Sequence, residues 1–309
     1  MPPVLLVAFN RPRETLRVIE NLRSVKPEVV YFAVDGARND RPDEIRLVHE
    51  TQKLAVEFDW DCRVYTRFQE INLGCGLGVS SAITWALTHE QAVIVLEDDV
   101  LPKPSFFEFC RELIERYKDD ERVFAVSGCN YVPGRFLSKR DSYRFAPITH
   151  VWGWAVWKRS WEHYEFDISE WRKTLTFRQL KYQLGGSWLA AILWSKTFDL
   201  VAQKKIDTWD YQLAFASIKM RSLVATSNVN LTENLGFNDR ATHTSSLPNY
   251  IQPTQDIEIP LIHPFVVLDK PANMWTQKYV YGAGFFSGFV LLAKYIKLSL
   301  KSYSYRAPD

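Results

Sequence analysis

The sequence has few cysteines and no long hydrophobic run. Its four cysteines lie far apart, with no CxxC pair, at Cys62, Cys75, Cys110 and Cys129. Scattered cysteines in a chain of 309 residues favour reduced thiols in a cytoplasmic compartment over a disulfide framework. The longest uncharged stretch, between Lys278 and Lys294, has fifteen residues, which is fewer than the ~20 needed to span a bilayer.

The chain also lacks an excess of charge of either sign. Lys and Arg total 38 and Asp and Glu total 36, so the formal net charge is +2. This balance argues against a nucleic-acid binder held mainly by phosphate contacts, and a hydrophobic content of 47% excludes a disordered chain. The charge is nevertheless uneven, because residues 270–306 contain six basic residues and no acidic one.

Short apolar runs alternate with amphipathic stretches in the first half of the chain. The alternation predicts an α/β fold with a doubly wound, mostly parallel sheet and helices on both faces. No repeat or low-complexity linker divides the chain, so we expect one unit made of a lobe at 1–130, a second lobe at 131–265 and a basic amphipathic tail at 266–309. The runs predicted as buried strands are 3–9, 29–34, 92–96 and 123–127, and a helix is predicted near 77–89.

Polar residues follow several of these predicted strands. Asn10 and Asp35 end the first two, and Glu97-Asp98-Asp99 follows the strand at 92–96. Ligands of such sheets bind beyond the carboxyl ends of the strands. Three adjacent carboxylates after a buried strand need a counter-charge, which a divalent cation with oxygen ligands supplies. A solvated acidic turn is the alternative interpretation.

Three glycines alternate in Gly74-Cys-Gly76-Leu-Gly78. The spacing is GxGxG rather than GxGxxG, and no apolar strand leads directly into it, which excludes a hydride-transferring dehydrogenase. A loop in contact with a ligand and a purely structural turn both remain open.

Isolated residues of the second half carry weaker signals. Asp210 lies in the first turn of a predicted helix with Thr208 or Asp207 as its N-cap; there it is either an ionised general base or part of the cap. His243 is a lone histidine in a polar loop, either a metal or phosphate contact or a surface residue. The tryptophans near 152–161 either belong to the core or offer a face to a sugar ring.

In combination these segments resemble nucleotide-sugar glycosyltransferases of the GT-A fold. The similarity covers about residues 3–245 and is greatest to the branch that includes N-acetylglucosaminyltransferase I and its bacterial relatives. It rests on Val7-Ala-Phe-Asn-Arg-Pro, Val34-Asp-Gly, Asn72-Leu-Gly, Val95-Leu-Glu-Asp-Asp-Val and Val151-Trp-Gly-Trp-Ala-Val-Trp.

The resemblance implies roles for individual residues. Asp99 is expected to bind Mn²⁺ or Mg²⁺ under the diphosphate, and Asp210, which follows a tryptophan, is the expected catalytic base. A histidine ligand such as His243 is not consistent in the family. The donor contacts implied are Asn10, Arg11, Asp35, Asn72, Gly74, Glu97 and Asp98, and the acceptor contacts are Trp152, Trp154 and Trp209.

The reaction implied is the transfer of a sugar from a nucleotide-diphosphate donor, with UDP expected, to a hydroxyl of a glycan or lipid-linked acceptor, with inversion. The alternatives are a sugar-1-phosphate nucleotidyltransferase and a membrane-tethered, non-catalytic protein that binds sugar nucleotides. A nucleotidyltransferase normally carries a Gly-rich basic signature after its first strand, where this chain has Asn10-Arg-Pro.

The basic tail offers a possible membrane contact. If 280–301 is helical, Lys294, Lys297 and Lys301 share one face and Phe285, Phe289, Leu292 and Ile296 the other. Aromatic residues from Trp275 to Tyr303 flank this stretch, as in interfacial helices. We therefore predict a cytoplasmic protein that is peripheral on the inner face of the membrane, with a tail helix packed on the core as the alternative.

Overall fold

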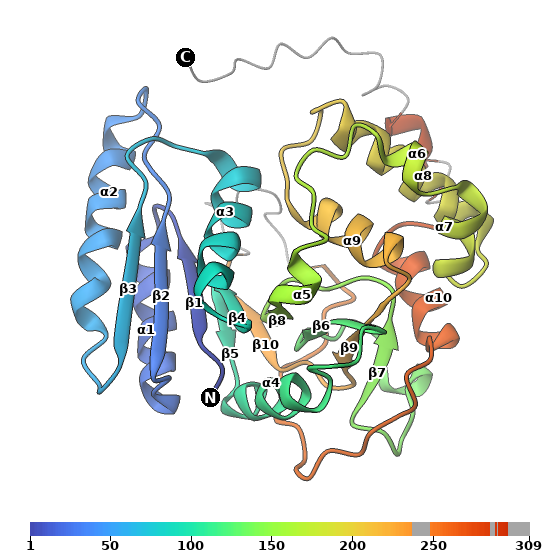
Figure 1. Ribbon diagram of the computed structural model, residues 1–309, viewed down its shortest axis with the longest axis horizontal. Helices are drawn as coiled ribbons and strands as arrows, with labels where there is room; N and C mark the ends of the chain where they lie inside the picture. The colour runs from blue at the N-terminus through green and yellow to red at the C-terminus, as the bar shows by residue number, and fades with distance from the viewer. Residues whose placement is uncertain (237–247, 285–287, 289, 296–309) are drawn as a thin grey trace.

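A computed structural model describes residues 1–236, 248–284, 288 and 290–295 (Figure 1). Its centre is an eight-stranded sheet with the strand order β3-β2-β1-β4-β8-β6-β9-β7. A separate two-stranded sheet pairs β5 with β10. The strands are β1 Val4–Ala8, β2 Val29–Val34, β3 Arg63–Phe68, β4 Ala92–Glu97, β5 Val100–Pro102, β6 Val123–Ser127, β7 Tyr143–Ala146, β8 Trp154–Trp157, β9 Leu223–Ser227 and β10 Thr232–Asn234.

Helices cover the sheet and build the second half of the molecule (Figure 1). The helices are α1 Pro12–Val25, α2 Pro42–Lys53, α3 Gly74–His89, α4 Pro104–Arg116, α5 Lys158–Trp161, α6 Trp171–Thr174, α7 Phe177–Gln183, α8 Trp188–Ala202, α9 Asp210–Lys219 and α10 Lys270–Tyr279, with short 3-10 turns η1 Leu54–Glu57 and η2 Gly134–Phe136.

Six of the eight strands in the large sheet run parallel, and β7 and β8 run antiparallel to them. The predicted class, an α/β fold with a mostly parallel sheet between helices, is therefore confirmed. Every residue of β1, β2 and β6 is buried, because both faces of this sheet are covered. One core lies on each face, and both contain residues that alternate along the same strands.

Two local features differ from the sequence prediction. Helix α3 begins at Gly74, three residues before the predicted start, so the glycines form its first turn. The stretch Trp154–Trp157 forms β8, which is inserted between β4 and β6. Its buried tryptophans pack within the sheet layers, which is why no amphipathic period marked it as a strand.

A third core holds α7, α8 and α9 together, beside the large sheet. Helix α10 packs against this group: the side-chain amide of Asn273 donates to the carbonyl of Leu184 at 2.9 Å, and the indole of Trp194 donates to Gln277 at 2.9 Å. The beginning of the predicted tail is thus part of the folded body. Trp275 is buried, in contrast to the interfacial position expected for it.

Part of the predicted tail helix lies outside the described residues. This holds for Phe285, Phe289, Ile296, Lys297, Lys301 and Tyr303. Residues 288 and 290–295, by contrast, are helical, with Lys294 exposed. Within the described part of the chain, no helix combines the length and apolarity that crossing a bilayer requires.

Candidate active site

A cavity of about 920 Å³ opens at the carboxyl ends of β1, β2 and β4. Asn10, Asp35 and Glu97, each at or just beyond one of these strand ends, lie in its wall. The second half of the molecule closes the opposite side with residues 205–207, from the α8–α9 connection, and with Trp152 and Gly236. Its volume falls in the range of ~300–1,000 Å³ that is typical of small-molecule sites.

At one end of the cavity the carboxylates after β4 meet an arginine. Nη1 of Arg11 lies 2.6 Å from Oδ2 of Asp99, and its Nη2 bonds to Oδ1 of Asp98. Asp98 also accepts a hydrogen bond from the backbone N–H of Phe9 at 3.2 Å. The guanidinium thus joins the end of β1 to the end of β4. The resemblance implied a donor contact for Arg11, and the structure shows in addition that Arg11 supplies a counter-charge to this cluster.

The cluster keeps an unbalanced negative charge. Burial, followed by the charges of Asp99 and Asp98, raises the pKa of Glu97, and the nearby Arg11 only partly offsets them. Burial also raises the pKa of Asp98 despite its pairing with Arg11. One arginine faces three carboxylates, so an additional cation would stabilise their ionised forms.

The carboxylate oxygens of this cluster suit a metal ion that binds together with a phosphate-bearing ligand better than a metal ion held entirely by protein side chains. No group of three or more His, Cys, Asp or Glu side chains among the described residues is arranged to hold a metal ion. Mg²⁺ and similar ions are commonly held by one or two carboxylates together with substrate phosphates, which is the arrangement that Asp98 and Asp99 could offer. Asp99 lies beside the start of the 235–247 segment, where Leu235 donates its N–H to the Asp99 carbonyl at 2.7 Å.

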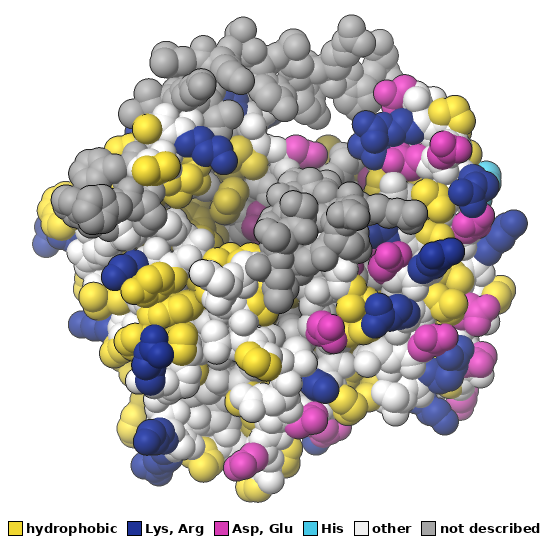
Figure 2. Space-filling view, turned by 180° about the vertical axis from the view of Figure 1, so that it is seen from behind, with side chains coloured by type: hydrophobic (Ala, Val, Ile, Leu, Met, Phe, Trp, Pro, Cys, Tyr) yellow, Lys and Arg dark blue, Asp and Glu magenta, His cyan; other side chains and the backbone are white. Residues whose placement is uncertain are grey.

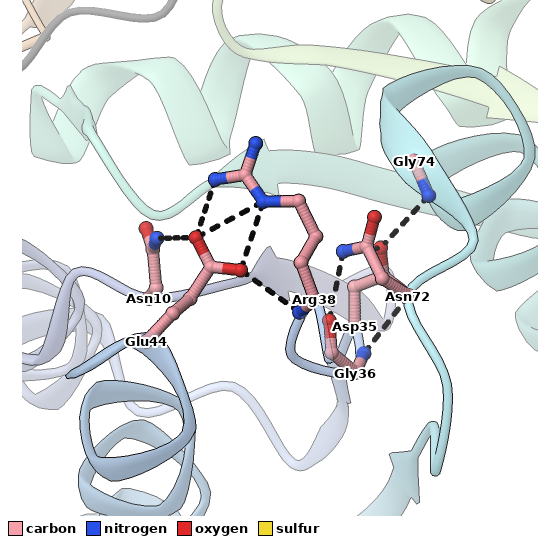
Figure 3. Close-up of polar contacts among 7 residues, drawn as sticks. All are labelled: Asn10, Asp35, Gly36, Arg38, Glu44, Asn72 and Gly74. Atoms are coloured by element: carbon pink, nitrogen blue, oxygen red, sulfur yellow. Dashed lines mark hydrogen bonds and ion pairs between the residues drawn. The ribbon is translucent and has the colours of Figure 1, made fainter. Parts of the chain in front are cut away.

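At the other end of the cavity, Asp35 organises the turn that begins α3 (Figure 3). Its carboxylate accepts hydrogen bonds from the backbone N–H groups of Leu73 at 3.0 Å and Gly74 at 3.2 Å, and from the side-chain amide of Asn72 at 3.1 Å. Burial raises the pKa of Asp35, and these backbone donors offset part of that effect. The structure therefore brings together Asp35, Asn72 and Gly74, three of the predicted donor contacts.

Next to this turn lies the carboxylate of Glu44, which the sequence analysis did not identify as part of the site (Figure 3). Glu44 is buried on α2 and accepts from the side-chain amide of Asn10 at 3.0 Å and from the backbone N–H of Arg38 at 2.9 Å. The Arg38 guanidinium also bonds to it, which lowers the pKa of Glu44. A signal was present: Glu44 shares the inner stripe of α2 with Val48 and Thr51, at helical spacing.

The alternating glycines allow two carboxylates to approach the first turn of α3. A Cβ on Gly76 would lie 2.6 Å from Oδ1 of Asp207, and one on Gly78 would lie 3.2 Å from Oδ2 of Asp35. The backbone N–H of Gly76 donates to Asp207 at 3.2 Å. The first N–H groups of α3 are thus bonded to carboxylates of the chain itself, and Gly74, Cys75 and Gly78 also line the cavity.

Asp210 is the first residue of α9, with Trp209 rather than Thr208 or Asp207 as its N-cap. Its Oδ1 accepts from the Thr208 hydroxyl and, at 3.0 Å, from the backbone N–H of Tyr211. Its charge is close enough to contribute to raising the pKa values of Glu97 and Cys75. Asp207, three residues earlier, forms part of the cavity wall.

The three predicted acceptor tryptophans occupy different positions. Trp152 lines the cavity, whereas Trp154 and Trp209 are buried in the core and stack on each other with ring centroids 5.6 Å apart. The rings of Trp154 and Trp209 pack together at the start of α9. Because both are buried, neither has an open face for a sugar. His243 lies outside the described residues.

Comparison with known proteins gives only remote similarities. No family model matches the chain, and no curated protein matches it. One similar solved structure is a mannosyltransferase from Pyrobaculum calidifontis in complex with GDP-mannose and Mn²⁺, with 13% identity over 97% of this chain and 80% of the other, at a TM-score of 0.35. Another is a mannose-1-phosphate geranyltransferase from Thermus thermophilus, with 10% identity over 74% of each chain and a TM-score of 0.30.

Proposed function

We propose that this chain is a metal-dependent glycosyltransferase that moves a sugar from a nucleotide-diphosphate donor to an acceptor hydroxyl. One observation carries the proposal: a single cavity joins the carboxylate cluster at β4 to the polar turn around Asp35 and Asn72. The first region suits a diphosphate with its cation, and the second suits a nucleoside with its many hydrogen-bonding groups.

Basic side chains in the cavity wall would receive the diphosphate. The side chains in question are Arg11, which lies at the carboxylate cluster, and Lys205, whereas Arg38, Arg41 and Arg67 line the cavity on the side of Asp35 and Glu44. The N-terminus of α3 is a poorer phosphate site, because Asp35 and Asp207 already accept from its N–H groups. We therefore assign the nucleoside to the Asp35 side of the cavity and the sugar to the side near Glu97 and Asp210.

Asp99, together with Asp98, would hold a divalent cation such as Mn²⁺ or Mg²⁺. When bound, this ion supplies Lewis-acid stabilisation of the charge that develops on the departing diphosphate. Arg11 would then exchange its bond to Asp99 for a contact with the diphosphate. Positive charge is retained at the site throughout this exchange.

Asp210 is the proposed general base. Its carboxylate takes the proton of the acceptor hydroxyl while the acceptor oxygen bonds to the anomeric carbon and the bond from that carbon to the diphosphate breaks. The position at the first residue of α9 and the N–H of Tyr211 favour the ionised carboxylate. Attack on the face opposite the diphosphate inverts the configuration, and the acceptor is a glycan or a lipid-linked saccharide.

Paired substitutions test these roles. Asp99→Ala and Asp210→Asn are each expected to abolish transfer, but only Asp99→Ala should weaken nucleotide binding in the presence of Mn²⁺. A thermal-shift screen of nucleotide sugars with and without Mn²⁺ identifies the donor, since a ligand that binds the folded state raises the Tm. Full turnover by Asp210→Asn would remove that residue as the base.

The products distinguish the proposal from its rivals. Transfer releases a nucleoside diphosphate, whereas a nucleotidyltransferase would release pyrophosphate, and mass spectrometry separates the two. A chain that neither binds nucleotides with Mn²⁺ nor hydrolyses a donor would instead be a binding protein without catalysis, and the proposal would be wrong.

A further inference from the structure

The corner between α7 and α8 exposes large apolar side chains together with basic ones. Tyr182 is 77% exposed, Trp188 63% and Ile192 37%. Arg178 and Lys181 lie on α7 beside them, and Nζ of Lys181 is 4.0 Å from the centre of the Trp188 ring. We call these five residues the α7–α8 face. None of them is part of the cavity wall or of the predicted tail.

Helix geometry groups the residues of this face on one side of each helix. Trp188 and Ile192 are four residues apart on α8 and therefore lie on one side of it, as Arg178 and Tyr182 do on α7. Both helices begin with a side-chain cap: Thr176 accepts from the N–H of Gln179, and Ser187 accepts from that of Ala190. The exposed aromatic groups are consequently presented by a well-defined corner.

The charged residues of the α7–α8 face, Arg178 and Lys181, are both basic. The sequence from 171 to 198 contains no acidic residue, and the first one on α8, Asp199, already bonds to Arg172 at 2.8 Å. On the left of Figure 2, the side on which α7, α8 and α10 lie, the visible side chains are mainly hydrophobic and basic, and the Asp and Glu side chains of this view lie toward its centre and right.

The described part of the C-terminal segment packs beside α8. A Cβ on Gly288 would lie 2.8 Å from Leu189, and the Tyr295 hydroxyl is 3.4 Å from that of Thr197. Gly288 and Tyr295 therefore lie against α8. Val290 is 72% exposed there, and Lys294, four residues further on, is also exposed.

We propose that the α7–α8 face binds the surface of a membrane that contains anionic lipid. Tryptophan, tyrosine and aliphatic side chains enter the boundary between headgroups and acyl chains, and neighbouring Lys and Arg are attracted by anionic headgroups. Protein interfaces, in contrast, are depleted in lysine. The absence of a carboxylate between residues 171 and 198 matches an anionic lipid surface in particular.

This docking would bring the cavity close to the bilayer. Helix α8 carries Trp188 at its first turn and leads through its C-terminal end to Lys205 and Asp207 in the cavity wall. At 1.5 Å per residue, its 15 residues span about 22 Å. The membrane contact itself is independent of the proposed transfer reaction.

Vesicle co-sedimentation of the full chain tests the inference. Binding to phosphatidylcholine vesicles that contain about 30% phosphatidylserine is expected at low salt, with weaker binding to pure phosphatidylcholine. The double variant Tyr182→Ala/Trp188→Ala should reduce the partition coefficient about tenfold or more. Arg178→Gln and Lys181→Gln should each reduce it about fivefold, and only on the anionic vesicles.

A matched control separates specific docking from general adhesion. Phe265 is 91% exposed and lies outside the α7–α8 face, so Phe265→Ala should leave vesicle binding unchanged. Equal losses in Phe265→Ala and Trp188→Ala would overturn the inference, as would failure of the unaltered chain to sediment. A dimer that Trp188→Ala dissociates, without vesicle binding, would make the face a contact between two copies instead. Circular dichroism and Mn²⁺-dependent nucleotide binding should be the same in all variants, which keeps this test separate from that of the transferase.

Discussion

The guanidinium of Arg11 bridges two carboxylates of one cluster, with Nη1 located 2.6 Å from Oδ2 of Asp99 and Nη2 bonded to Asp98. Burial would lower the pKa of Arg11, but the charges of these two residues outweigh it and raise that pKa. A cation that binds to Asp99 therefore competes with a fixed positive charge already present.

Arg11→Ala should consequently change metal and nucleotide binding in opposite directions. Without the competing guanidinium, Mn²⁺ should bind about tenfold more tightly in the absence of nucleotide, since charge-assisted hydrogen bonds contribute ~1.5–3 kcal/mol. Nucleoside diphosphate should bind more weakly in the presence of Mn²⁺. Isothermal titration calorimetry measures both affinities. The exposed Arg13 provides the control, and unchanged Mn²⁺ affinity in Arg11→Ala would contradict the competition.

Gly76→Ala should disturb the site although it removes no functional group. The new Cβ would lie 2.6 Å from Oδ1 of Asp207 and 3.0 Å from the Thr208 carbonyl, so the start of α9 has to shift. We expect a loss of about 1–3 kcal/mol in the free energy of unfolding and of roughly 100-fold in kcat through misplacement of Asp210. Urea titration and an activity assay measure these effects. A Cβ on Gly134 would have no other atom within 4 Å, so Gly134→Ala should be close to neutral.

Glu44→Gln should destabilise the fold and do so in a pH-dependent way. Because the bond to Arg38 lowers the pKa of Glu44 in the folded state, the unaltered chain gains stability above the ordinary carboxyl pKa of ~4.3. The gain disappears as the pH falls through the folded-state value. The difference in unfolding free energy between the two proteins should therefore be largest near pH 7 and shrink below pH 4.

A second carboxylate on the same helix serves as the control for this measurement. Glu50 pairs with Arg46 at 2.6 Å on the exposed side of α2. Exposed pairs contribute ~0–1 kcal/mol, so Glu50→Gln should have little effect at any pH. Equal effects of Glu44→Gln and Glu50→Gln would show that the buried polar group is not important for stability.

His150 should make the protein sensitive to mild acid. Burial, reinforced by the nearby Arg144, lowers the pKa of His150 to about 3, whereas the unfolded chain takes up this proton near pH ~6.5. Between these values His150 binds one more proton in the unfolded state, so it lowers the free energy of unfolding by up to about 1.4 kcal/mol per pH unit as the pH decreases, whereas carboxyl groups with a raised pKa, such as Glu97, act in the opposite direction. Urea unfolding between pH 7 and pH 5 measures the total slope. The slope of the unaltered chain minus that of His150→Gln gives the contribution of His150, and the exposed His49→Gln should have the slope of the unaltered chain.

The parts of the site that belong to regular strands could be predicted from the sequence, because buried parallel strands are continuous apolar runs. The prediction for β2 and β6 has the observed bounds, and Asp35 and Glu97 follow from the ends of their strands. The strand β8 could not be predicted, since its partners β4 and β6 are set by tertiary packing and its residues resemble an aromatic core segment.

Contacts between residues that lie far apart in the sequence could not be predicted either. Arg11 stands 87 and 88 positions from its two carboxylate partners, and nothing local marks it as their counter-charge. Asp207 likewise meets Gly76 across 131 positions. Glu44 is different, because a carboxylate on the buried stripe of an amphipathic helix can be recognised from spacing alone.

The first turn of α3 has two anchors, Asp35 at the end of β2 and Asp207 from the segment that leads to Asp210. A ligand that binds the Asp35 carboxylate would weaken the hydrogen bonds from Asp35 to this turn. The turn would then be held mainly by Asp207. Because the three glycines have no side chains, Asp35 and Asp207 both approach the backbone of the turn directly. A movement of the turn would therefore be transmitted to the segment that leads to Asp210. Under the proposed roles of Asp35 and Asp210, donor binding would thus alter the position of the base, which would restrict proton removal to the donor-bound chain.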